Sequence, residues 1–62
     1  MSYMLQTESR EWIRRHRQKV REVGANEARG WWRKVSYDIA WIRGQSAFDD
    51  LRDEMNRQRG HV

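Results

Sequence analysis

Two long stretches of the chain carry apolar positions at steps of three and four residues, the spacing of a helix that buries one face. In the first stretch, the positions that share this face are Leu5, Trp12, Ile13, His16, Val20 and Val23. In the second stretch, they are Ala28, Trp31, Trp32, Val35, Ile39 and Ile42. Proline is absent from the chain, so nothing interrupts either pattern, and we predict helices over residues 5–23 and 27–43.

The segment between these two helices contains the signals of a helix end and a helix start. Gly24 follows Val23, and a glycine in the left-handed conformation often closes a helix. Asn26 suits the N-cap of the second helix. Because so short a connection makes sequential helices antiparallel neighbours, we predict an αα-hairpin. Gly30 either weakens the second helix by about 1 kcal/mol relative to alanine or lets the two backbones approach closely.

A third, shorter amphipathic pattern follows Gly44, and we predict a third helix over residues 47–59. Ser46 and Asp49 match a capping box with aspartate in place of the usual glutamate. Acidic residues come early in this segment and arginines come late, which suits the helix dipole. The alternative is one long second helix that bends at Gly44.

Size and composition indicate that the chain needs support to stay folded. Residues 1–62 form one small domain in which 37% of the residues are hydrophobic, and chains this short bury only about 60% of their unfolded surface. Cysteine is absent, and His16 and His61 are the only soft metal ligands, so we expect no disulfide, no metal site and no cofactor. We therefore predict an all-α fold, an antiparallel αα-hairpin with a short third helix, assembled as a homodimeric helical bundle.

Motifs of the common catalytic sites are missing from the sequence. There is no HExxH metal motif, no glycine loop for phosphates and no nucleophile elbow, and no base is evident for Ser9, Ser36 or Ser46. We therefore expect no enzyme and no small-molecule substrate. No apolar run is long enough to span a bilayer, and no secretory signal is visible, so we expect a cytoplasmic protein with no membrane partner.

Aromatic residues are the main candidates for an oligomer or partner interface, because they contribute disproportionately to interfaces. The candidates are Trp12, Trp31, Trp32, Tyr37 and Trp41. Tyr37 and Trp41 lie one turn apart, opposite the apolar face of their helix, so something else must cover them. The third helix, a second copy of the chain and a foreign partner all remain open. His16 lies on the apolar face of the first helix, and we expect a packed, structural histidine there.

Basic residues gather in the first half of the chain. Residues 8–34 hold nine basic and four acidic side chains, and on a helix Arg10, Arg14, Arg17 and Arg21 align in one row. Such a row suits contacts with nucleic-acid phosphates. The other interpretation is a solvated face that is neutralised by Glu11–Arg15 pairing and by the acidic third helix. A helix-turn-helix is not predicted, because the helix that would enter the groove begins with acidic residues.

The run Met4–Arg17, MLQTESREWIRRHR, followed by Trp31–Val35, WWRKV, resembles the small accessory proteins encoded in the early region of lambdoid temperate bacteriophages. This resemblance implies a helical, dimeric protein made early in phage development, which acts in the host cytoplasm by binding a host or phage protein. It assigns no role to any single residue. We expect a non-enzymatic regulatory protein that binds a protein partner through a helical surface, and the alternative is nucleic-acid binding through the arginine row.

Overall fold

Three helices make up residues 3–60, the part of the chain that the computed structural model describes. Helix α1 spans Tyr3–Val23, α2 spans Ala25–Arg43 and α3 spans Gln45–Arg59, and no strand occurs in this part of the chain. The predicted all-α fold with a third helix is therefore confirmed. The alternative of one bent second helix is wrong, because the helix breaks at Gly44.

A single glycine forms each connection. Gly24 has φ 91° and ψ 165°, and Gly44 has φ 95° and ψ 153°. This combination of positive φ and extended ψ is essentially restricted to glycine, because a Cβ atom would clash with the backbone. Gly24 therefore has the positive φ of the predicted left-handed conformation, but its extended ψ differs from that of a left-handed helix. The predicted caps at Asn26 and Ser46 are also wrong, because both residues lie inside the first turns and the glycines hold the cap positions.

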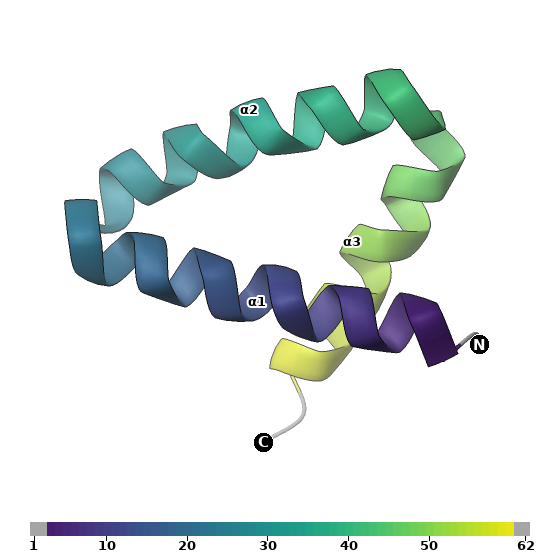
Figure 1. Cartoon of the computed structure of the whole chain (residues 1–62), viewed down its shortest axis with the longest axis horizontal. Coiled ribbons are helices and arrows are strands. Elements are labelled where there is room, and N and C mark those ends of the chain that lie inside the picture. The colour runs from purple at the N-terminus through teal and green to yellow at the C-terminus, as the bar shows by residue number, and fades with distance from the viewer. Residues whose placement is uncertain (1–2, 61–62) are drawn as a thin grey trace.

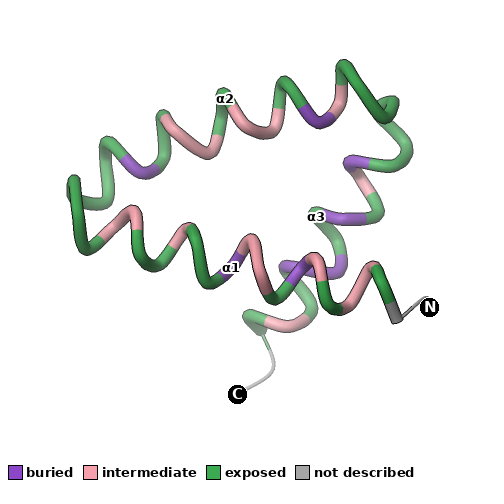
Figure 2. The backbone as a smooth tube through the Cα atoms, viewed as in Figure 1, coloured by how far each residue is buried: buried purple, intermediate pink, exposed green. Residues whose placement is uncertain are grey.

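The three helices outline a flat triangle (Figure 1). Helices α1 and α2 run antiparallel and diverge from Gly24, and α3 closes the open end and crosses α1 with its C-terminal half. The principal dimensions are 32 × 30 × 15 Å, and the radius of gyration is 11.7 Å. A folded chain of this length is expected at about 10.6 Å, so the helices are packed but spread in one plane. This arrangement leaves the outer side of α2 without a neighbouring helix among residues 3–60 (Figure 2).

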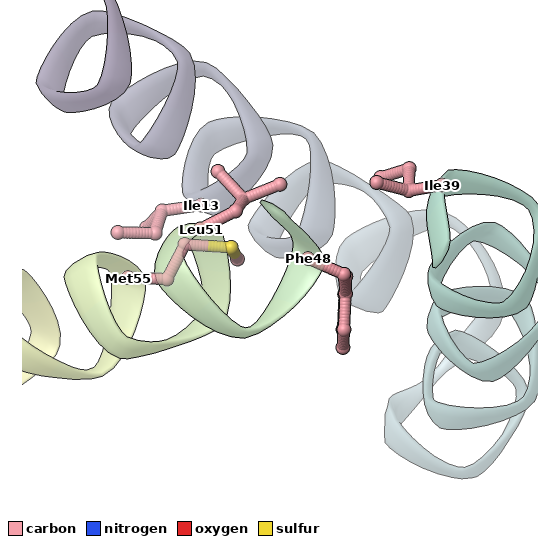
Figure 3. Close-up of a cluster of buried hydrophobic side chains, with 5 residues drawn as sticks. All are labelled: Ile13, Ile39, Phe48, Leu51 and Met55. Atoms are coloured by element: carbon pink, nitrogen blue, oxygen red, sulfur yellow. The ribbon is translucent and has the colours of Figure 1, made fainter. Parts of the chain in front are cut away.

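The core lies where α3 meets the other two helices. It consists of Ile13 from α1, Ile39 from α2, and Phe48, Leu51 and Met55 from α3 (Figure 3). The short third helix thus supplies more of the core than either long helix, because its narrow apolar face is wedged into the open end of the hairpin.

A buried carboxylate holds the end of α3 to the start of α1. The Glu54 side chain has no exposed surface, and it accepts hydrogen bonds from Arg57 Nε at 2.9 Å, from Arg57 Nη2 at 2.5 Å and from Gln58 Nε2 at 2.9 Å. Gln58 Nε2 also donates to the backbone carbonyl of Gln6 in α1 at 3.2 Å. The bonds from Arg57, and then from Gln58, lower the pKa of Glu54 to about 2.

Acid is expected to destabilise the fold in two stages. The pKa of His16 lies below 6.5 in the folded chain, because burial and then the charge of Arg59 disfavour its protonation, so the unfolded chain binds protons first and stability begins to fall below pH about 6.5. Glu54 follows, since its ordinary pKa is 4.5 and its folded pKa is about 2. Stability from Glu54 is complete above pH about 4.5 and is lost as the pH falls toward 2.

Thermal melts followed by circular dichroism from pH 7 to pH 2 measure this effect. We expect the Tm to drop most steeply below pH about 4.5. Glu54→Gln is the matched control, because it keeps the shape of the side chain and cannot titrate. The variant should melt lower than wild type at pH 7 and lose less between pH 4.5 and pH 2. Equal losses in the two proteins would contradict the role given to Glu54.

Candidate interaction surfaces

The outer face of α2 is a row of residues that point away from α1 and α3. By helical spacing this row consists of Gly30, Lys34, Tyr37 and Trp41. The exposed fractions are 71% for Tyr37 and 81% for Trp41. The predicted position of Tyr37 and Trp41, opposite the packed face of their helix, is therefore confirmed. Helix α3 does not cover them, which leaves a second copy of the chain or another partner as the coverings still open.

Gly30 lies on this same outer face. A Cβ atom added there would meet nothing within 4 Å. Gly30 therefore does not serve a close approach of α1 and α2, and within residues 3–60 its effect is to weaken the helix.

The three other predicted interface aromatics pack against one another inside the chain. The ring centroids of Trp12 and Trp32 lie 5.7 Å apart, those of Trp12 and Trp31 lie 6.3 Å apart, and His16 meets the edge of Trp32 at 6.4 Å. All are half-buried. Arg15 lies over the ring of Trp12 at 5.0 Å. This cluster joins α1 to α2, and it reaches the core because the ring of Trp32 lies 6.4 Å from that of Phe48.

The arginine groove is a second surface, formed by α1 and the end of α3. Its hollow of about 400 Å³ is lined by Arg10, Ile13, Arg14, Arg17, Arg21, Gln58 and Arg59. The row of four arginines that helical spacing predicts on α1 is thus present on one wall. The sequence interpretation missed Arg59, whose place at the end of α3 was attributed to the helix dipole, and the crossing of α3 over α1 brings it to the groove.

Ion pairs divide the arginines into neutralised and free side chains. Arg14 Nη2 lies 2.5 Å and Arg15 Nε lies 3.1 Å from Glu11 Oε1, so the predicted Glu11–Arg15 pair is confirmed. The hydrogen bonds from Arg14, and then from Arg15, lower the pKa of Glu11 to about 2. The expected neutralisation of the row by α3 is absent from residues 3–60, because the acidic side chains of α3 that form ion pairs bind arginines of α3 itself.

The third surface is a larger hollow of about 750 Å³ beside the first half of α1. Met4 and Trp12 give it apolar walls, and an ion pair between Arg43 Nη2 and Glu8 Oε2 at 2.7 Å joins α2 to α1 at its edge. Within the described residues, no group of three His, Cys, Asp or Glu side chains is placed to hold a metal ion. No helix in residues 3–60 is long and apolar enough to span a membrane.

Comparison of the chain with protein-family models, with curated proteins and with solved structures gives no match. The resemblance to early phage proteins therefore stays a prediction. The function has to be argued from the geometry of the surfaces described above.

Proposed function

We propose that this protein is a non-enzymatic interaction module that acts by binding a protein chain along the outer face of α2. The observation that carries the proposal is the exposure of Trp41, which is 81% exposed beside Tyr37 at 71%. Tryptophan and tyrosine are enriched among the residues that contribute most to protein–protein binding. Nothing in residues 3–60 covers this face, so the free chain leaves a large apolar area in water.

The partner proposed for this face is a second copy of the chain. In a two-fold symmetric pair, each contact of one residue with another is repeated with the subunits exchanged. An antiparallel pairing of two α2 helices about a point near Ser36 brings Trp41 opposite Gly30 of the partner subunit and Lys34 opposite Asp38 of the partner subunit. The space above Gly30 is empty, so it accommodates a large ring. This pairing sets a large side chain against a small one and a cation against an anion, which supports the second copy as partner.

Self-association also fits the size and shape of the chain. A triangle 15 Å thick with a core of five buried apolar residues buries little surface. Because small domains without disulfides or metals often gain stability by oligomerising, a dimer through α2 supplies the missing apolar burial. The regulatory role expected from the sequence, binding of a host or phage protein, would then belong to the homodimer.

Truncation of both aromatic side chains is expected to break the dimer. Tyr37→Ala with Trp41→Ala should raise the dimer Kd by about 30-fold or more, the effect of losing one residue worth about 2 kcal/mol. Because both side chains are exposed in the single chain, the variant should keep its helical content. Sedimentation equilibrium over a concentration series measures the Kd, and circular dichroism measures the helical content.

Met4→Ala is the matched control, because Met4 is 79% exposed and lies on α1, away from the outer face of α2. Its Kd should stay within about 2-fold of wild type, as expected for a surface substitution outside an interface. If the wild-type chain still sediments as a monomer at a concentration 100-fold above the assay range, the proposal that the partner is a second copy of the chain is overturned. An equal rise in Kd for Met4→Ala would overturn the assignment to α2.

A further inference from the structure

We propose that the arginine groove binds the phosphate backbone of a nucleic-acid double helix without reading its base sequence. This site is separate from the outer face of α2, since one wall belongs to α1 and the other to the end of α3. Among residues 3–60, seven side chains line the groove, of which five are arginines and none is acidic.

Most of the charges in the groove form no ion pair within residues 3–60. Among residues 3–60, only Arg14 of the five lining arginines has an ion pair, with Glu11. Arg10, Arg17, Arg21 and Arg59 form none of the ion pairs found there. The charge of Arg59 also reaches across to α1, because it contributes to the lowered pKa of His16. Gathering several uncompensated guanidinium groups in one hollow is unfavourable, and bound phosphates relieve that repulsion.

The length of the row matches a chain of phosphates better than a single one. Arg10 and Arg21 are eleven positions apart, which is about 16 Å along a helix at 1.5 Å per residue. Successive phosphates of one DNA strand advance by about 3.4 Å along the duplex axis, so the row spans several of them. Arginine also suits this ligand, because its planar fork donates two parallel hydrogen bonds to one phosphate.

The lining of the groove argues against a single strand and against reading of bases. Proteins that bind single strands combine basic residues with aromatic rings that stack on the bases, and within the described part of the chain no aromatic residue lines this groove. Trp12 lies in the aromatic cluster and lines the larger hollow beside α1, not the groove. Gln58 is the one neutral polar residue that residues 3–60 contribute to the lining, and its amide nitrogen already donates to Glu54 and to the backbone carbonyl of Gln6. Apart from its arginines, residues 3–60 therefore give the groove no free donor for a base edge.

The shape of the site argues against a lipid surface. A membrane is met by a convex ridge with exposed apolar side chains beside the basic ones. Here the arginines surround a hollow between two helices, and Ile13, the apolar residue in its lining, is buried. A rounded backbone that enters the hollow reaches both walls, whereas a flat surface does not.

Binding is expected to be measurable and strongly salt-dependent. The probes are a fluorescent 20-base-pair DNA duplex and an RNA hairpin with a stem of about the same length, each titrated with the full chain and followed by anisotropy. The logarithm of the affinity should fall against the logarithm of the salt concentration with a slope of about −3.6 for four free arginines or −4.5 for five. Between 50 and 200 mM salt, the affinity should drop about 150- to 500-fold. The tighter of the two probes identifies the nucleic acid.

Charge reversal inside the groove separates a local site from general attraction. Arg17→Glu with Arg59→Glu places one change on each wall, and its matched control is Arg29→Glu with Arg33→Glu on the exposed surface of α2. Each pair of changes lowers the formal net charge from +4 by four, to zero. At 50 mM salt, the groove variant should lose about 100-fold or more in affinity for the duplex, and the control should lose less than about 10-fold.

Three results would overturn the proposal. They are an equal loss in the two charge-reversed variants, no binding of either nucleic acid at 50 mM salt, and binding to vesicles of phosphatidylserine and phosphatidylcholine without binding to a duplex. Circular dichroism checks that the variants are folded, and Arg17→Gln with Arg59→Gln is a milder pair that should still weaken binding about 10-fold. The groove variants should also keep the dimer Kd of wild type, so failure of this site is distinguishable from failure of the α2 interface.

Discussion

Leu51→Ala is expected to lower the free energy of unfolding by about 2–5 kcal/mol, the range measured for truncations of buried leucines. Leu51 is only 1% exposed and belongs to the core cluster, where α3 packs against both long helices (Figure 3). A domain of this length is typically stable by only about 3–9 kcal/mol. The substitution should therefore remove a large part of the stability, because Leu51 lies at the centre of the core that joins the three helices.

Urea titration followed by circular dichroism at 222 nm measures this loss. Leu51→Met keeps the side-chain volume and should cost less than about 1.5 kcal/mol, which separates the effect of a cavity from that of changing the residue. Met4→Ala removes a side chain of similar size from an exposed position and should change the free energy of unfolding by less than about 0.5 kcal/mol. Similar losses for Leu51→Ala and Met4→Ala would show that α3 does not hold the core.

The helices themselves were accessible from the sequence, and their connections were not. Spacing of apolar residues places each helix within two residues of its observed bounds, because burial of one face repeats along the whole element. The caps failed because the sequence interpretation assumed that a side chain must satisfy the first turn. The chain instead reverses at a single glycine in each connection. The carbonyl of Gly24 accepts a hydrogen bond from the backbone N–H of Ala28, and the carbonyl of Gly44 accepts one from Phe48.

The candidate surfaces also divide into features that the sequence predicts and features that depend on how the helices pack. Alignment of Arg10, Arg14, Arg17 and Arg21 depends on one helix only, so spacing predicts it. The contribution of Arg59 depends on where α3 crosses α1, and the crossing follows from the conformation of Gly44 and the packing of Leu51. The helical periodicity of the sequence predicts neither the conformation of Gly44 nor the packing of Leu51. The exposure of Tyr37 and Trp41 follows from their position opposite the packed face, but spacing does not show which element, if any, covers them.

Replacing either connecting glycine by alanine is expected to destabilise the fold by about 1–3 kcal/mol, the cost of forcing an L-residue into a backbone region that glycine alone adopts readily. Gly44→Ala is the more informative change. An added Cβ at Gly44 would meet nothing within 4 Å, so steric contact with the rest of the chain contributes no part of the loss. Alanine also favours a continuous helix, and the variant should therefore shift toward a state in which α2 runs into α3 and Leu51 leaves the core.

Gly30→Ala is the matched control, because Gly30 has the same open surroundings but lies inside a helix and has no positive φ. It should stabilise the single chain by about 0.5–1 kcal/mol. The same type of substitution is thus expected to act in opposite directions at two positions that differ only in backbone conformation. Urea titrations of the three proteins measure both signs, at concentrations below the dimer Kd so that the α2 face does not contribute. Stabilisation by Gly44→Ala would mean that the chain does not need the sharp turn, and the triangular fold, together with the α3 wall of the arginine groove, would then be wrong.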